Sequence, residues 1–126
     1  MAISGMFNYT DILGKAMQTA VLRDSVISNN IANAETPGFK RNAVRFESYL
    51  ENAVDNFRRT NVLDLSGIRP RIVAEFSDFY YRFDENNVDI EAEMVDLYQN
   101  SVRFDTMAAG ILNYYRIINM VLTAQF

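Results

Sequence analysis

The segment Ser28–Lys40, SNNIANAETPGFK, predicts the end of a helix followed by a sharp turn. Thr36 precedes a proline and is therefore pushed out of the α-helical region of backbone space. Pro37 fixes φ at the second position of a turn, and Gly38 can adopt the positive φ that a type II turn needs at the third position. We therefore expect the chain to leave its first helix here and to change direction.

Three asparagines, Asn29, Asn30 and Asn33, lie just before this turn, within about one and a half helical turns of one another. Each side-chain amide both donates and accepts hydrogen bonds. Two interpretations are open. The amides either cap the helix end within the subunit or bind the backbone of a neighbouring subunit.

Before the turn, apolar residues repeat at alternating spacings of four and three over about residues 11–34, a heptad-like stripe made of Leu13, Met17, Ala20, Ile27, Ile31 and Ala34. Asp24 occupies the one missing stripe position, and it should face a partner donor or the edge of the stripe because an unpaired buried carboxylate is costly. We expect residues 1–7 to form a flexible apolar leader, with Asn8 or Thr10 capping the helix that follows.

A second stripe predicts a helix over residues 90–124, where ten residues keep strict four-three spacing: Ile90, Met94, Leu97, Ser101, Phe104, Ala108, Ile111, Tyr115, Ile118 and Leu122. Ser101 is its single polar member. Asp89 should be the N-cap, with Glu91 and Glu93 in the electropositive first turn. A flanking apolar set makes this face wider than one partner helix would cover: Val95, Tyr98, Val102, Ala109, Leu112 and Val121.

The middle of the chain predicts smaller elements. Helical spacing of apolar residues indicates a short helix near residues 45–58, which Asn61 helps to end. Residues 70–83 are rich in aromatic and β-branched residues and predict one or two extended segments, with a break near Ser77 and Asp78. The expected fold is mainly α: two long terminal helices paired as an antiparallel coiled coil, with a short helix and a small extended segment between them. We expect one domain, residues 1–126, divided into 1–35, 36–88 and 89–126.

Composition removes several classes of function. The chain has 126 residues, a net charge of −4, no cysteine and no histidine. It therefore lacks the commonest general base and transition-metal ligand, and the negative charge argues against nucleic-acid binding. A calcium site in residues 84–89 is conceivable, but the segment lacks the spacing and glycine of an EF-hand loop. Basic residues cluster in the middle third, including Lys40 and Arg41, and are expected to meet an acidic neighbour. No cleavable signal peptide or membrane span is visible.

Two segments carry a resemblance to a known family. Ser28–Lys40 closely resembles the signature SNNIANAxTPGFK near the N-terminus of bacterial flagellar axial proteins, which form the rod and the hook. Asn86–Met94, NNVDIEAEM, resembles the NNVDxExEM segment that opens the C-terminal helix of the same proteins. The resemblance covers roughly the first forty and the last forty residues, and on it the chain is identified as a member of the flagellar basal-body rod family.

The resemblance implies a structural role without catalysis, cofactor or metal. Family members assemble helically into the periplasmic rod, transmit torque and enclose the export channel. They leave the cell through the flagellar type III apparatus without a cleaved signal. The implied partners are copies of the chain, other rod proteins, the rod-base adaptor, the membrane ring and the export gate. The heptads alone would also suit a soluble coiled-coil adaptor that forms a closed small oligomer.

The residues expected at subunit interfaces form two groups. Those at the joint after the first helix are Asn29, Asn30, Ile31, Asn33, Pro37, Gly38 and Phe39. Those in the stripe of the C-terminal helix are Leu97, Phe104, Ile111, Tyr115 and Ile118. The stripe is expected to be a packing seam, either within one subunit or between subunits.

Overall fold

The structure, a computed structural model, describes residues 2–76 and 83–124. Its elements in chain order are α1 (Ala2–Ala32), β1 (Asn42–Arg45), α2 (Glu47–Thr60), β2 (Arg71–Ala74) and α3 (Ile90–Thr123). The two long terminal helices pack against each other. The two strands, which lie between these helices in chain order, form a small antiparallel sheet. The predicted fold class is confirmed.

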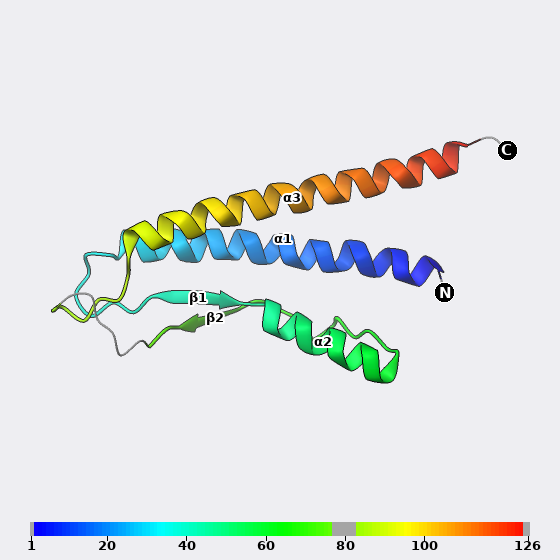
Figure 1. Cartoon of the computed structure of the whole chain (residues 1–126). Coiled ribbons are helices and arrows are strands. Elements are labelled where there is room, and N and C mark those ends of the chain that lie inside the picture. The colour runs from blue at the N-terminus through cyan, green and yellow to red at the C-terminus, as the bar shows by residue number, and fades with distance from the viewer. Residues whose placement is uncertain (1, 77–82, 125–126) are drawn as a thin grey trace.

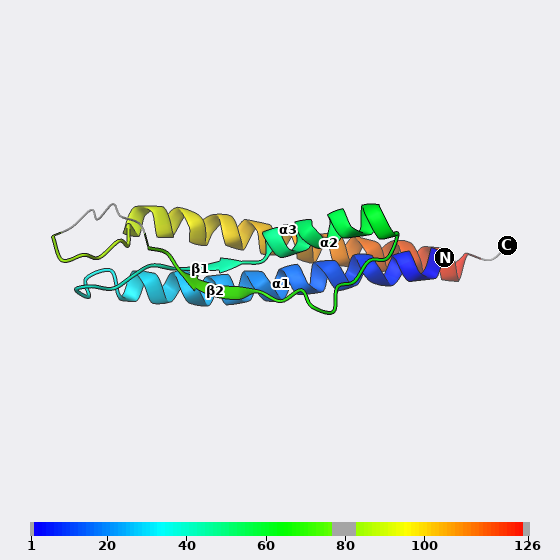
Figure 2. The same cartoon turned by 90° about the horizontal axis from the view of Figure 1, so that it is seen from below.

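The elements lie along one long axis (Figure 2). The strands β1 and β2 and helix α2 lie on one side of the helix pair (Figure 1). The strands lie along α1, and α2 overlaps α3 in the view from below (Figure 2). The helices run antiparallel, so both termini lie at one end of the molecule (Figure 1). The turn that leaves α1 and the segment that leads into α3 lie together at the other end, which we call the tip.

Helix α1 begins earlier than the sequence suggested. It starts at Ala2, so the predicted flexible leader is wrong, and Asn8 and Thr10 lie inside the helix rather than at its N-cap. No proline interrupts this stretch, and the single Gly5 costs a helix only about 1 kcal/mol relative to alanine. The helical backbone therefore continues through this stretch.

The sheet pairs one strand that the sequence predicted, β2, with one that it did not, β1. Within residues 70–83, β2 occupies Arg71–Ala74, and it pairs antiparallel with β1, with Asn42 opposite Ala74 and Arg45 opposite Arg71. Strand β1 precedes α2 and was not predicted, because the sequence Asn-Ala-Val-Arg is short and only weakly alternating. The predicted break at Ser77 and Asp78 lies outside the described residues.

Helix α2 and its return segment make a small core with α1. The predicted helix end is confirmed: Asn61 has a left-handed φ of 57°, and its N–H donates to the carbonyl of Phe57. Phe46, Leu65 and Ile68 form a buried cluster, against which further side chains of α1, α2 and the return segment pack: Ile12, Ala16, Tyr49, Leu50, Ala53 and Leu63. The middle segment is therefore folded back onto α1.

Helix α3 begins as predicted, with the Asp89 carboxylate accepting from the N–H groups of Glu91 and Ala92. Its packing face differs from the predicted four-three stripe at five of the ten positions. The half-buried members of the predicted seam are Leu97, Phe104, Ala108, Ile111 and Ile118, whereas the exposed members are Ile90, Met94, Ser101, Tyr115 and Leu122. The most buried residues of α3 are instead Glu93 and Asn100. Apolar patterning excludes such residues from a seam, but both have hydrogen-bond partners on other segments.

Candidate subunit-interface site

The tip holds a cluster of mostly buried polar side chains. Asn30, Asn86 and Glu93 are each 0% exposed, and Asn87 is also buried. They come from the end of α1, the segment before α3 and the first turn of α3. Arg41, from the segment that leads into β1, completes what we call the tip cluster. Buried polar groups require partners, and the tip cluster supplies them from within the chain.

Asn30 connects three elements. Its Oδ1 accepts from the N–H of Asn42 at 2.9 Å, and its Nδ2 donates to the carbonyl of Asn42 at 2.8 Å. The same Nδ2 donates to Oε2 of Glu93 at 3.1 Å. The amide thus pairs with the outer edge of β1 as a neighbouring strand would, while it also binds α3. This geometry fixes the end of α1 against both.

Arg41 neutralises the buried carboxylate. Its Nε donates to Oε1 of Glu93, and its two terminal nitrogens bind Glu75 at 2.8 Å and Asp96 at 3.0 Å. Partial burial lowers the pKa of Arg41, but the hydrogen bonds to Glu93 and Glu75 outweigh that effect and leave the pKa raised. The prediction that Arg41 meets an acidic neighbour is wrong in one respect, because the acids that bind it belong to its own chain.

Asn86 holds the turn after α1. Its Nδ2 donates to the carbonyls of Asn33 at 3.0 Å, Ala34 at 2.9 Å and Thr36 at 2.9 Å, and its Oδ1 accepts from the N–H of Val88. Gly38 has the predicted positive φ, 71°. The two sequence segments that carry the family resemblance therefore lie in contact. Asn86 of the second segment holds the turn in Ser28–Lys40 through hydrogen bonds.

The predicted joint residues divide by their surroundings. Asn30 is internal, and Asn33 caps the helix end, since its Nδ2 donates to the carbonyl of Asn29 at 2.8 Å. The bond of Asn33 matches the capping interpretation, whereas Asn30 instead binds Asn42 and Glu93 of its own chain. Of the rest, the exposed residues are Asn29, Pro37 and Gly38, and the half-buried ones are Ile31 and Phe39. Contact of this set with a neighbouring subunit stays a prediction.

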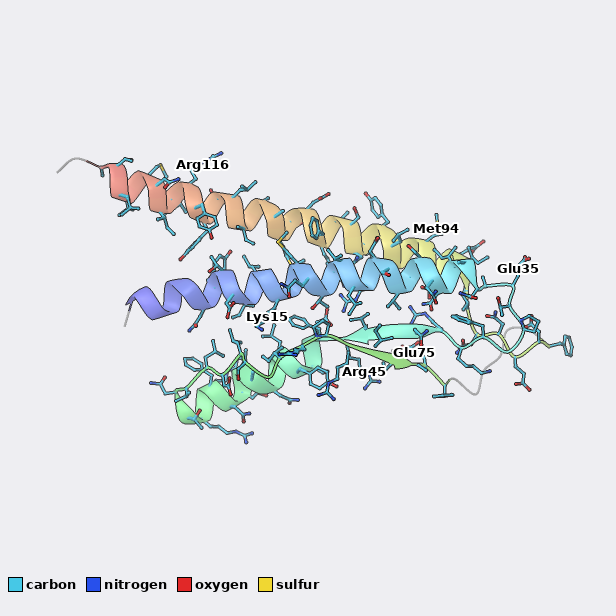
Figure 3. All side chains as sticks on the ribbon, turned by 180° about the vertical axis from the view of Figure 1, so that it is seen from behind. Lys15, Glu35, Arg45, Glu75, Met94 and Arg116 are labelled. Carbon is cyan, nitrogen blue, oxygen red and sulfur yellow. The ribbon has the colours of Figure 1, made fainter. Side chains whose placement is uncertain are left out.

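The side of α3 that faces away from α1 is rich in exposed apolar groups. Tyr98 is 72% exposed and Leu112 is 71% exposed, and Met94, Val95 and Val102 are exposed as well. Tyr115 and Leu122 are also exposed, although they belong to the four-three stripe, and so is Val121. Met94 and Arg116 point away from α1 (Figure 3). In the described part of the chain, no helix is long and apolar enough to cross a membrane.

Residues 84–89, where a calcium site was only conceivable, use their side-chain oxygens for other contacts. Oδ1 of Asp84 accepts from the N–H of Asn86, Oδ1 of Asn87 accepts from the N–H of Arg41, and Asp89 caps α3. Across residues 2–76 and 83–124, no group of three or more acidic side chains is arranged to hold a metal ion. The oxygen-rich sequence serves the turn and the helix start.

Sequence reasoning missed Glu93 and Arg41 as a buried pair. Glu93 was assigned to the dipole of the first helical turn, which is a surface role. The available signal was its place inside the second family segment, seven residues before Asn100 on the same helical face. Asn86 was likewise treated as a polar break, although its side chain donates to three carbonyls of the turn after α1.

Comparison with known proteins agrees with the class that the fold and the tip define. Residues 11–40 match the family described as "Flagella basal body rod protein". The chain is 35% identical to the flagellar basal body rod protein FlgB of Borreliella burgdorferi over 90% of each chain. It is 31% identical to FlgB of Borrelia hermsii, over 97% of this chain and 96% of that one, and 31% identical to FlgB of Bacillus subtilis, over 88% and 90%.

These matches first identify a flagellar basal body rod protein. Within that class, the chain belongs to the FlgB family.

Proposed function

We propose that this chain is a structural subunit of the proximal flagellar rod, where copies assemble helically through their paired terminal helices. The supporting observation is the exposed apolar side of α3, on which Tyr98 and Leu112 are each more than 70% exposed. Large contiguous apolar surfaces on a soluble chain mark contact sites. Helix α1 covers one side of α3, so neighbouring subunits would cover the other.

The mechanism is mechanical. Helices of 31 and 34 residues reach about 46 Å and 51 Å at 1.5 Å per residue, so the pair is a long strut. The tip cluster bonds the middle segment to both helices, which suits a subunit that carries load. In this proposal the assembled rod transmits torque and encloses the export channel. The chain acts as one unit over residues 1–126 and performs no catalysis.

The proposed surroundings follow from the family. The neighbours are copies of this chain, other rod proteins, the rod-base adaptor, the membrane ring and the export gate. The site is the periplasmic part of the basal body, reached through the type III apparatus without a cleaved signal. At the joint, the exposed Asn29, Pro37 and Gly38 contact the next subunit, while Asn30 and Asn33 shape that surface from beneath. On α3, Tyr115 meets a neighbour directly.

The test is a substitution that disrupts the exposed apolar side of α3 and leaves the fold of the subunit intact. Leu112→Asp places a carboxylate on that side, where the isolated chain leaves the position in water. We expect export to continue, the amount of this protein in isolated basal bodies to fall to background, and swimming to stop. Phe57→Asp is the matched control, because it makes the same kind of change at an exposed apolar residue of α2 rather than of α3.

Two results would refute the proposal. One is a Leu112→Asp variant that enters basal bodies and swims as the unchanged chain does. The other is the absence of the unchanged chain from isolated basal bodies. The closed-oligomer adaptor is separated by sedimentation of the pure chain: an adaptor gives a stable dimer or tetramer over a wide concentration range, whereas the rod subunit stays monomeric without a template.

A further inference from the structure

Strands β1 and β2 place two arginines directly opposite each other. Arg45 of β1 pairs with Arg71 of β2 in the antiparallel register, and Arg69 precedes Arg71 by two residues. All three residues are exposed. Opposite residues of an antiparallel pair project their side chains from the same face, with Cβ atoms about 4.5–5.5 Å apart, so two positive side chains start side by side. We call these three residues the arginine patch.

The arginine patch lies on the outer face of the sheet. Val44, the residue before Arg45, is buried and lines a cleft together with Ile27 of α1. Successive residues of a strand point to opposite faces, so Arg45 and its partner Arg71 project from the face that is turned away from α1. Figure 3 shows Arg45 on that side and Met94 of α3 on the opposite side of the molecule. Another molecule can therefore reach the patch without displacing either long helix.

Within residues 2–76 and 83–124, no carboxylate forms an ion pair with the arginine patch. Two acids at the ends of the strands bind other cations, since Glu47 pairs with Arg23 and Glu75 pairs with Arg41. Like charges directly opposite each other destabilise a sheet, and this sheet has only two strands to hold it together. An anionic partner would remove that repulsion, so the arrangement favours binding of negative charge.

The surroundings of the patch favour carboxylates carried by a protein. The guanidinium of Arg71 lies over the ring of Tyr49, 5.5 Å from its centre, which restricts its orientation. Guanidinium groups bind carboxylates through two parallel hydrogen bonds. Ile72, the next residue of β2, is 53% exposed, and arginine together with aromatic and apolar groups is typical of protein contact surfaces. A long polyanion is disfavoured, because the chain as a whole has a net charge of −4.

We propose that the arginine patch binds an acidic segment of a different basal-body protein, whose carboxylates pair with Arg45, Arg69 and Arg71. The proposal rests on the rod assembly described above. There, copies of this chain meet through the exposed side of α3, which leaves the opposite side of the molecule to a different neighbour. The middle segment then carries a contact of its own, and its repelling arginines are neutralised only in the assembled structure.

A charge reversal separates binding from folding. Arg71→Glu places a carboxylate opposite Arg45 and creates a cross-strand ion pair that the unchanged chain lacks. We expect the urea concentration at half-unfolding to stay the same or rise, while the amount of the chain in basal bodies falls to background and swimming stops. Arg45→Glu is the reciprocal change and should give the same result. Arg59→Glu is the matched control, because Arg59 is an exposed arginine of α2 without an ion pair among the described residues, and this variant should swim.

Carbodiimide cross-linking identifies the partner. The reagent joins a lysine amine to a carboxylate in direct contact and does not act on arginine, so the variant Arg45→Lys with Arg71→Lys makes the patch reactive. Isolated basal bodies that contain this variant are treated, and the joined peptides are identified by mass spectrometry. We expect products that link position 45 or 71 to an aspartate or glutamate of another protein. The control variant Arg58→Lys with Arg59→Lys should give no such product.

Three results would overturn the proposal. The first is normal swimming of both Arg71→Glu and Arg45→Glu. The second is a fall in the urea midpoint of both variants, which would contradict the repulsion between the two arginines. The third is that the introduced lysines join no carboxylate, or only carboxylates of this chain and its copies. Each of these leaves the rod assignment intact, whereas absence of the unchanged chain from isolated basal bodies overturns the rod assignment itself.

Discussion

Removing the Arg41 side chain should cost more stability than removing any exposed ion pair of this molecule. Arg41 is the cation that faces Glu93, a carboxylate with 0% exposed side chain. In Arg41→Ala, the hydrogen bond that remains to that carboxylate comes from Nδ2 of Asn30. Breaking a buried pair by removing one partner costs about 3–5 kcal/mol, since the other charge stays out of water. We expect a loss of that size in the free energy of unfolding.

The assay is urea unfolding followed by far-ultraviolet circular dichroism, with sucrose present to strengthen the folded state of a small chain. Arg58→Ala is the matched control. Arg58 also binds an acid, Asp55, but the two side chains are 75% and 49% exposed. Exposed pairs contribute about 0–1 kcal/mol, so this variant should unfold near the urea concentration of the unchanged chain.

The double variant Arg41→Met with Glu93→Leu separates charge burial from lost packing. Replacing both charges with apolar groups of similar size is often neutral or stabilising, so most of the loss should return. The reasoning is refuted if Arg41→Ala costs no more than Arg58→Ala, or if the double variant is as unstable as Arg41→Ala.

Three further outcomes follow from the geometry. Gly38→Ala should destabilise the chain by roughly 1–2 kcal/mol, because φ is 71° there, and Gly38→Asn should cost less; thermal unfolding compares the two. Asn86→Ala should cost at least about 1–3 kcal/mol in urea unfolding, since three turn carbonyls lose their donor. The pKa of Glu47 is lowered: partial burial raises it, but backbone hydrogen bonds and Arg23 outweigh that effect. The pKa of Glu47 is lower in the folded state than in the unfolded state, so ionised Glu47 stabilises the fold above about pH 4.5, and this stabilisation is lost as the pH falls. Glu47→Gln should therefore reduce the loss of unfolding free energy that is measured between neutral and acidic pH.

Local rules of helix and turn formation account for what the sequence predicted well. Asp89 caps α3, Asn61 ends α2 and Gly38 takes a positive φ, each as expected from neighbours close in the chain. Such features depend on a few adjacent dihedral angles and hydrogen bonds, so a short window of sequence contains the relevant physics. The class of protein could also be recognised from the sequence, because each of the two segments that resemble the family is a contiguous run of residues.

Long-range pairing accounts for what was missed. Strand β1 is defined by β2 and by the amide of Asn30, which replaces a third strand at its outer edge. Glu93 belongs to the packing face of α3 because Arg41 and Asn30, more than fifty residues away in the chain, satisfy it. Apolar periodicity cannot assign a polar residue to a packing seam. Burying a polar group is costly unless it is hydrogen-bonded, and the pattern of apolar residues does not show which partners the fold will supply.

The sequence by itself determined two long terminal helices, a turn at Pro37 and Gly38, a short middle helix and membership of the rod class. Tertiary structure alone decided which side of α3 meets α1, where the middle segment lies, and that Arg45 and Arg71 lie opposite each other. The physical reason is range: helix periodicity and turn chemistry act within a few residues, whereas the choice of packing face depends on hydrogen-bond and charge partners that only the folded chain brings together.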